Sequence, residues 1–224
     1  MVRALLALVP ALLAHACLAQ GVVTLGLDSQ DRYRGLPGPL PGPALRASAM
    51  ADGPAGLYGG MSVVALARAR QFGRAQAVLG ISRRIGGDWA WDLALMRDHY
   101  PGNGDYDYTE LMAGVIVGEQ SLRAWASRHY YGQPPAALYL DWSGAMRLDS
   151  RWRLLAHLGS LSVAHGPAGD EPVTPRTDAL LGVGLLTGSM DLRLSVDGLL
   201  RGRDSEDGGR VPHPGWLASA SMAF

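Results

Sequence analysis

MDLRLSVDGLL, residues 190–200, alternates apolar and polar side chains over most of its length. Because successive side chains of a β-strand point to opposite faces, a strand here has one face of Leu192, Leu194 and Val196 and one charged face. Gly188-Ser189 before the stretch and Gly202 after it supply turn residues. The pattern therefore indicates a strand of an antiparallel sheet with two unlike faces.

The same alternation recurs along the chain, and the links between segments are short and long in turn. Outer-membrane barrels show this pattern, with tight turns on one side and loops on the other. We expect an all-β fold, an antiparallel transmembrane β-barrel of about 12 strands within a range of roughly 10–14, with both termini periplasmic. The segments are 22–34, 43–52, 56–67, 74–85, 88–98, 106–117, 120–131, 136–148, 151–165, 176–187, 190–201 and 213–224.

A soluble β-sandwich or barrel with an apolar core would show the same alternation. Three features favour lipid. Aromatic residues lie near predicted strand ends, from Tyr33 to Trp216, as in the two girdles of a membrane barrel. The chain ends in Phe224 after alternating apolar residues, as bacterial outer-membrane proteins do.

The third feature is the set of ionisable side chains on the faces opposite the apolar rows. Such groups are costly in a dry core and natural in a wet or paired lumen. We expect a lumen of mixed sign, with charged groups from alternating strands setting selectivity. The candidate lumen residues are Asp92, Glu110, Arg123, Asp141, Arg147, Arg153, Arg193 and Asp197.

Residues 1–19 have the pattern of a secretory signal peptide, and residues 20–224 then form the barrel domain. Arg3 precedes a short apolar run, and small residues lead to a cleavage site after Ala19. Lipidation of Cys17 is the alternative processing route. The pattern predicts Sec-type export to the outer membrane of a bacterium.

Composition limits the partners. The chain has 20 Lys+Arg and 20 Asp+Glu, hence a formal net charge of +0, which argues against nucleic acid. One Cys excludes a disulfide scaffold and a Cys-based zinc site, and we predict no cofactor. The expected partners are the lipid bilayer, lipopolysaccharide, small solutes and the barrel-assembly machinery, which would engage the C-terminal strand ending in Phe224.

The sequence offers two other candidate sites. Asp98, Asp105, Asp107 and Glu110 surround the loop YPGNGD at residues 100–105 and could bind Ca²⁺ through oxygen ligands, but the Pro-Gly-Asn-Gly sequence favours a simple hairpin turn.

An outer-leaflet enzyme would need a histidine beside a nucleophile and a carboxylate. Asp98-His99 is the only adjacent acid–histidine pair of the mature chain, and its two side chains point to opposite faces of a strand. We therefore favour interfacial histidines over catalysis. The mature chain has five histidines, and all but His157 fall near the outer ends or loops of the predicted strands: His99, His129, His157, His165 and His213.

Three local motifs resemble those of the TorF family of porin-like outer-membrane barrels. YRGL at residues 33–36 is similar to its Tyr-x-x-Arg-Gly-Ile/Leu motif with a shortened spacing. GLYGG at residues 56–60 resembles its Gly-Phe/Leu-Tyr-x-Gly motif, with Met61 where the family has Trp. YPG at residues 100–102 and YTE at residues 108–110 resemble its Tyr-Pro-Gly and Tyr-x-Glu pair. The resemblance runs from about Val22 to Val163.

The resemblance implies an outer-membrane barrel of Gram-negative bacteria and little chemistry. Together with the patterns above, it makes a porin or narrow channel for small solutes the leading expectation. Glu110 is expected to pair with an arginine of the lumen. The alternatives are an outer-leaflet enzyme, of lipid hydrolase or protease type, and a structural or binding barrel without flux.

Overall fold

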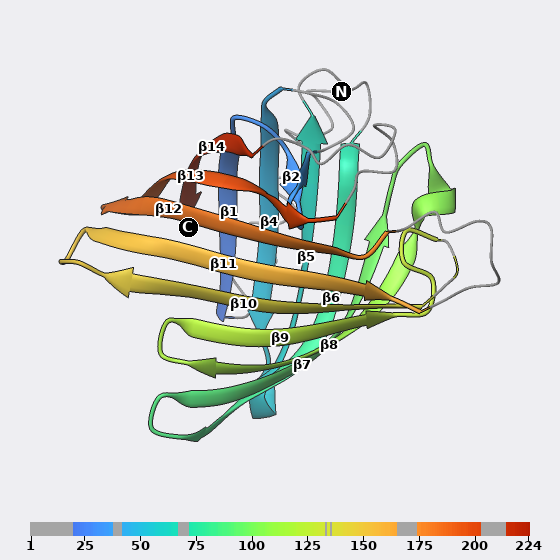
Figure 1. Cartoon of the computed structure of the whole chain (residues 1–224). Helices are drawn as coiled ribbons and strands as arrows, with labels where there is room; N and C mark the ends of the chain where they lie inside the picture. Colours follow the sequence, from blue (N-terminus) through green and yellow to red (C-terminus); the bar gives the residue numbers. More distant parts are fainter. Residues whose placement is uncertain are drawn as a thin grey trace.

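Twelve strands form one closed antiparallel barrel (Figure 1). The computed structural model describes residues 20–37, 42–66, 72–132, 134, 136–164, 174–202 and 214–224. The barrel strands are β1 (Gln20–Asp28), β4 (Ala44–Asp52), β5 (Leu57–Leu66), β6 (Phe72–Gly86), β7 (Trp89–His99), β8 (Tyr108–Val117), β9 (Gln120–Ser127), β10 (Ala137–Arg147), β11 (Trp152–Val163), β12 (Arg176–Thr187), β13 (Met190–Arg201) and β14 (Gly215–Ala223).

The described part of the chain also holds two short 3₁₀ turns, η1 (Pro54–Gly56) and η2 (Gly104–Tyr106), and the short strands β2 (Arg32–Tyr33) and β3 (Leu36–Pro37). None of its helices is long and apolar enough to cross a bilayer. The all-β class and a strand number of about twelve are thereby confirmed. Residues 1–19 with Cys17, and the loop residues His165 and His213, lie outside the described residues.

The first and last strands close the barrel. In β1, Thr24 lies opposite Ser48 of β4 on one side and opposite Ala223 of β14 on the other. The backbones of Val23 and Phe224 exchange two hydrogen bonds, of 2.9 and 3.2 Å. Closure leaves no open sheet edge, which is the condition for a sheet to stand in lipid.

Both described chain ends lie at the barrel end that carries the tight turns. Gln20 at the start of β1 is opposite Asp52, next to the short β4–β5 link, and β14 ends beside the start of β1. An even number of antiparallel strands requires this arrangement. We call this the turn end of the barrel and the other the loop end.

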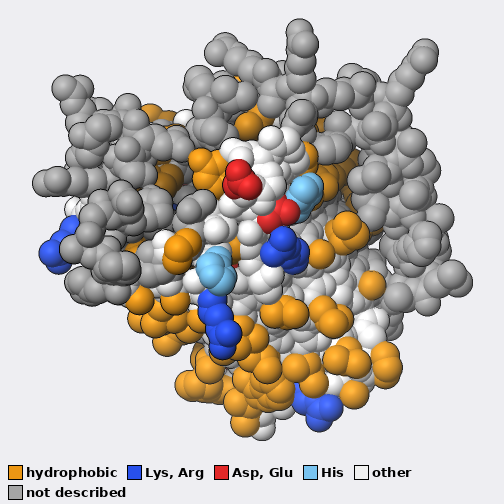
Figure 2. All heavy atoms as spheres, turned by 90° about the vertical axis from the view of Figure 1, so that its right-hand side faces the viewer, with side chains coloured by type: hydrophobic (Ala, Val, Ile, Leu, Met, Phe, Trp, Pro, Cys, Tyr) orange, Lys and Arg blue, Asp and Glu red, His pale blue; other side chains and the backbone are white. Residues whose placement is uncertain are grey.

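The outer wall of the barrel is apolar. Leu181 of β12 is 70% exposed, Leu79 of β6 65% and Trp216 of β14 69%. Figure 2 shows hydrophobic side chains gathered over the lower part of one face, with acidic side chains and histidines above them. An exposed apolar surface of this extent needs an environment other than water, and the alternation of each strand places the polar side chains inside.

Most tyrosines near the loops do not form the expected outer girdle. Tyr108 and Tyr130 are each 1% exposed and pack inside the barrel with Tyr139 and Leu161. Tyr100 and Tyr131 pack against that cluster. For Tyr108 the reason is strand parity, since it shares a face of β8 with Glu110. Tyr100, Tyr130 and Tyr131 lie in loops between the strands, and the path of those loops carries them inside. Outward aromatic side chains are present, and they are mainly tryptophans: Trp89, Trp142, Trp152 and Trp216.

The first predicted segment is also wrong in its length. The pattern predicts one strand over residues 22–34, whereas β1 ends at Asp28. Ser29 then bonds the last strand, its N–H donating to the Ala218 carbonyl at 2.8 Å and its Oγ accepting from the Ala218 N–H at 3.0 Å. The chain turns inward from this point, because the polar residues after Asp28 find partners inside the barrel.

A lipid-facing outer wall predicts a depth-dependent cost for charge. We expect Leu181→Arg, at the middle of β12, to reduce the free energy of unfolding in bilayers by about 2–4 kcal/mol. The control Thr187→Arg, at the turn end of the same strand, should cost about 0–1 kcal/mol. Urea unfolding in vesicles, followed by tryptophan fluorescence, measures both. Equal costs at the two positions would contradict a lipid-facing wall.

Candidate functional site in the barrel lumen

The connection between β1 and β4 enters the barrel as a hairpin. Strands β2 and β3 pair with Tyr33 opposite Leu36, and Arg34 and Gly35 form the two-residue turn between them. Their φ angles are 50° and 76°, so both adopt the left-handed conformation that tight hairpin turns require. A Cβ on Gly35 would lie 2.3 Å from the Cβ of Asp178 in β12, so the turn fits closely against the opposite wall.

An ion pair across the barrel holds the tip of this lumen hairpin. Arg34 Nη1 and Nη2 donate to the two carboxylate oxygens of Glu110 at 2.9 and 2.8 Å. Glu110 lies on β8, which is five strands from β1 by the shorter way around the ring, so Arg34 reaches it through the interior. Both side chains are at most 6% exposed. A bidentate pair this well buried fixes orientation as well as distance.

Aromatic rings surround the Arg34 guanidinium. Its Cζ lies 4.3 Å from the ring centre of Tyr139 and 4.9 Å from that of Tyr33. Tyr130 and Trp125 follow at 5.3 and 5.6 Å. Cation–π attraction strengthens as water is excluded, so these rings help to offset the cost of burying the charge.

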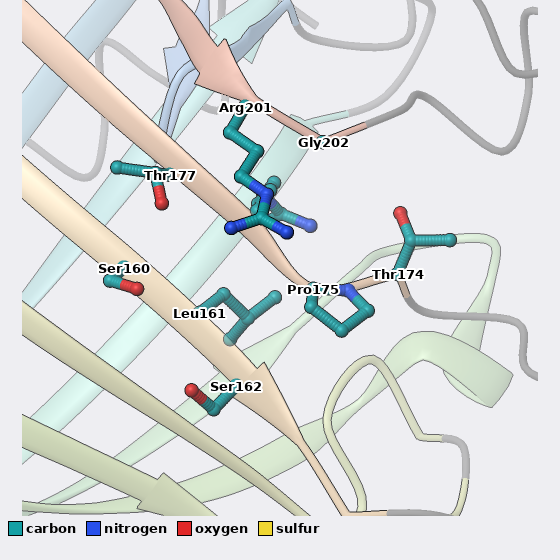
Figure 3. A pocket seen from close by; sticks show the side chains of 9 residues that line it. Ser160, Leu161, Ser162, Thr174, Pro175, Thr177, Arg201 and Gly202 are labelled. Carbon is teal, nitrogen blue, oxygen red and sulfur yellow. The ribbon is translucent and has the colours of Figure 1, made fainter.

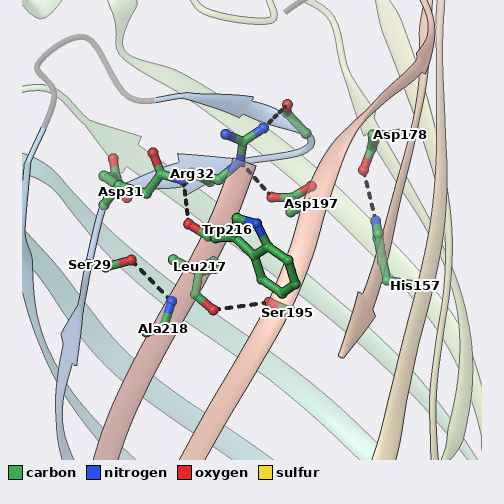
Figure 4. Close-up of polar contacts among 12 residues, drawn as sticks. Ser29, Asp31, Arg32, His157, Asp178, Ser195, Asp197, Trp216, Leu217 and Ala218 are labelled. Carbon is green, nitrogen blue, oxygen red and sulfur yellow. Dashed lines mark hydrogen bonds and ion pairs between the residues drawn. The ribbon is translucent and has the colours of Figure 1, made fainter. Parts of the chain in front are cut away.

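A second set of contacts holds the stem of the hairpin. Arg32 Nε donates to Asp197 Oδ2 on β13 at 3.0 Å, and Gln30 donates to the Trp216 carbonyl at 3.0 Å (Figure 4). Arg46 of β4 bonds Asp28 and, at 2.8 Å, Asp31. The Tyr33 and Tyr108 hydroxyls are 3.2 Å apart. The hairpin is therefore attached to strands around the ring and lies in the bore as a fixed obstruction.

A cavity of about 410 Å³ remains beside the hairpin. Its lining comes from the hairpin and from most of the barrel strands, which identifies it as the open part of the lumen. Arginines line it from the hairpin, β4 and β6, and acidic groups with one histidine line it from β10 to β13. The charged lining residues are Arg32, Arg34, Arg46, Arg74, Asp141, His157, Asp178 and Asp197.

His157 lies between two carboxylates. Its Nε2 is 2.9 Å from Asp178 Oδ1, and its Nδ1 is 3.4 Å from Asp141 Oδ1 and 3.0 Å from Ser143 Oγ. A serine, a histidine and an aspartate thus meet, as in a hydrolase. However, Ser143 Oγ donates to Asp141 at 2.7 Å, and carboxylates face both ring nitrogens. Both nitrogens are thus placed to donate, whereas a catalytic base must accept a proton. The cluster instead joins β10, β11 and β12.

Among the arginines that line this cavity, Arg74 of β6 has the weakest charge compensation. Its guanidinium lies 4.1 Å from the Tyr33 ring centre, and its Nε is 3.9 Å from Asp98 Oδ1. Nη1 is buried and has no hydrogen-bond partner. Asp98 itself is fully buried and accepts from Gln76 at 3.0 Å. Arg74 is therefore a cation of the cavity wall that its neighbours neutralise only in part.

The acids proposed from the sequence find partners inside the barrel, and Glu110 pairs with an arginine as expected. Glu110 pairs with Arg34 and Asp197 with Arg32, both on the hairpin. Asp92 accepts a hydrogen bond from the Tyr58 hydroxyl at 2.7 Å. Asp141 lies opposite Arg123 in the β9–β10 register.

The remaining proposed arginines lie toward the turn end. Arg153 and Arg193 share Asp191, and Arg147 bonds Glu119 with 73% of its own side chain exposed. The sequence pattern does not reveal the residues that form the obstruction, because alternation predicts one continuous strand over residues 22–34. The available signal was Arg34-Gly35, since Gly favours a two-residue turn.

The loop considered for calcium is fastened by hydrogen bonds. Asp107 accepts from the Tyr100 N–H at 2.8 Å, and its Oδ2 is 2.7 Å from His99 Nδ1. Slight burial opposes the shift, but these bonds and the nearby Arg97 hold the pKa of Asp107 below its usual value. In the part of the chain that the structure describes, no group of three or more His, Cys, Asp or Glu side chains is placed to hold a metal ion.

Comparisons with known proteins identify the fold. No family model matches the chain. No curated protein sequence matches it. Among solved structures it is similar to a KdgM porin, with a TM-score of 0.58 and 7% identity over 91% of this chain and 99% of that chain. It is also similar to a NanC porin, with a TM-score of 0.57 and 9% identity over 90% of this chain and 98% of that chain.

A third similar structure is a KdgM porin in complex with disordered oligogalacturonate, with a TM-score of 0.53 and 6% identity over 91% of this chain and 99% of that chain. Identities this low show a shared fold, which here is that of a porin barrel of nearly the same length. The relatives in fold are thus channels rather than enzymes.

The geometry predicts that Glu110 anchors the hairpin. Glu110→Gln leaves the Arg34 charge buried without its counter-ion, a loss of about 3–5 kcal/mol. We expect lower stability and a larger, noisier conductance as the hairpin is released. The control Glu119→Gln removes an exposed pair and should cost less than about 1 kcal/mol. Urea unfolding measures the stability of each variant, and bilayer recordings measure its conductance. An E110Q variant with unchanged stability and unchanged conductance would contradict the role of Glu110 as an anchor.

Proposed function

We propose that this chain is a narrow porin of the bacterial outer membrane, through which small solutes pass passively. The observation that carries the proposal is the lumen itself, a cavity lined from around the ring and narrowed by a hairpin that ion pairs hold in place. The cavity volume of about 410 Å³ falls within the range of small-molecule sites. The similarity in fold to porins supports the same conclusion.

We propose further that the chain belongs to the TorF family. Residues from two of the motifs that resemble that family touch in the lumen: Tyr33 meets Tyr108, and Arg34 pairs with Glu110. The two motifs lie far apart in the sequence, and these direct contacts between their side chains would explain why both occur in the same chain. The shortened Tyr33–Arg34 spacing fits this contact, since both residues lie at the hairpin tip.

The cellular route is part of the proposal. Residues 1–19 would direct Sec-type export, the turn end would be periplasmic, and the loop end would face outward among lipopolysaccharide. The assembly machinery would engage β14, and Phe224 at its end is 62% exposed beside the barrel seam.

The eight charged positions chosen from the sequence are proposed as lumen groups that, with the hairpin, set selectivity. Two of them, Asp141 and Asp197, line the cavity. Most of their charges are compensated within the protein, and Arg74 is the cavity-lining arginine with the poorest compensation. We therefore propose that Arg74 biases the channel toward anions.

Single-channel recording in planar bilayers tests the channel. We expect small, well-defined conductance steps from the folded barrel, with folding checked by heat-modifiable gel mobility. A variant with residues 30–37 replaced by a Gly-Ser linker should conduct more, because the hairpin no longer fills the bore. Silence of both correctly folded proteins would contradict the porin proposal and favour a binding or structural barrel.

Reversal potentials in a salt gradient test the role of Arg74. A unit charge about 10 Å away in water contributes about 0.4 kcal/mol, or roughly a factor of two in permeability. We expect Arg74→Gln to lower the anion-to-cation permeability ratio by about that factor or more. Arg97→Gln is the matched control, because Arg97 is half-exposed and pairs with Asp107 on the loop-end rim. If both variants shift the ratio equally, Arg74 has no special role.

A further inference from the structure

A second hollow, of about 630 Å³, lies on the outer wall of the barrel (Figure 3). It is found where β11, β12 and β13 reach the loop end. Leu161 of β11 points inward, being 2% exposed and packed against Tyr139, so its neighbours Ser160 and Ser162 point outward. On β12, Arg176 is buried and Thr177 is the outward residue. The hollow therefore opens to the surroundings of the barrel and is separate from the lumen.

A β-bulge turns an arginine into this hollow. The register between β12 and β13 pairs Asp178 with Leu199 and then Thr177 with Arg201, which leaves Leu200 as the extra residue. Without the bulge, Arg201 would share the inward face of Leu199, which is 5% exposed. With it, Arg201 lies opposite Thr177 and is exposed on the outer wall. Bulges often serve to redirect one side chain in this way.

The outer wall changes character at the same level. Along β11 the outward residues Leu154 and Leu158 give way to Ser160 and Ser162. Along β12 the outward Leu181, 70% exposed, gives way through Ala179 to Thr177. The change from Leu to Ser and Thr marks the edge of the hydrocarbon layer, which is where lipid headgroups lie.

Arg201 is free to meet a partner at this level. No hydrogen bond or ion pair joins it to another residue of the described ranges. A guanidinium at the edge of the hydrocarbon layer lies within reach of anionic lipid headgroups. Its planar fork matches the oxygens of a phosphate, and the Ser160, Ser162 and Thr177 hydroxyls can add donors to the same group.

We propose that this hollow binds the phosphate of an outer-leaflet lipid, with Arg201 as the charged ligand and Ser160, Ser162 and Thr177 as hydroxyl donors. Exposed Leu158, Leu181 and Leu200 would carry the acyl chains. The occupant is a phosphorylated glycolipid of the lipid A class, since that lipid fills the outer leaflet on the loop side. This assignment rests on the outer-membrane orientation given under the proposed function.

Lipid binding by the purified full-length barrel tests the site. Native mass spectrometry would compare bisphosphorylated lipid A, dephosphorylated lipid A and inorganic phosphate. We expect the phosphorylated lipid to bind about tenfold more tightly than the dephosphorylated one. Arg201→Gln should abolish that difference, and Thr177→Val should reduce it. The control Arg97→Gln should preserve it, because Arg97 already pairs with Asp107 on the same rim.

Three results would overturn the assignment: an unchanged phosphate preference in folded R201Q, equal binding of the two lipids to the unaltered protein, or displacement of the lipid by millimolar inorganic phosphate. Gel mobility shows that each variant is folded. Conductance recorded on the same samples separates this site from the channel. We expect the R201Q variant to conduct normally. If the unaltered barrel does not conduct but still prefers the phosphorylated lipid, that result contradicts the porin proposal and leaves the lipid site standing.

Discussion

The hydrogen bonds between β1 and β14 are the constraint on which the rest of the structure depends. They close the ring of strands, so every strand has two neighbours and no edge faces the apolar surroundings. Closure also separates the two faces of each strand. Leucines and tryptophans cover the outside, and the charged residues must find partners within a bore of limited width. Everything of functional interest in the lumen follows from that confinement.

Confinement explains why the β1–β4 connection folds inward. The polar stretch after Asp28 can satisfy its groups on the interior walls, with Arg32 and Arg34 meeting carboxylates on β13 and β8. Gly35 permits the tip to lie against Asp178, where any larger residue would collide. The hairpin thus turns a ring of strands into a narrow passage, and the remaining cavity takes its charge pattern from the residues that hold the hairpin.

The sequence predicts the wall of this barrel far better than its contents. Each strand repeats a period of two, so alternation alone locates segments such as 190–201, which the structure reproduces as β13. The sequence indicates an arginine partner for Glu110 but not which one, because Arg34 is distant in sequence and alternation places it in a continuing strand. The tyrosines show the same limit: Tyr108 and Tyr130 occur near strand ends, but strand parity and loop path decide that they pack inside. Arg201 likewise faces outward only because of a bulge.

The choice of an ion pair at the hairpin tip has a physical consequence. Burying Arg34 and Glu110 costs several kcal/mol per ion, so an apolar pair of similar volume could give equal or greater stability. An apolar tip, however, would slide over the wall, since dispersion contacts have no direction. The two parallel hydrogen bonds of Arg34, enclosed by aromatic rings, permit one position. A passage only slightly wider than its solutes needs such a fixed obstruction, because a small displacement of the tip changes the free cross-section by a large fraction.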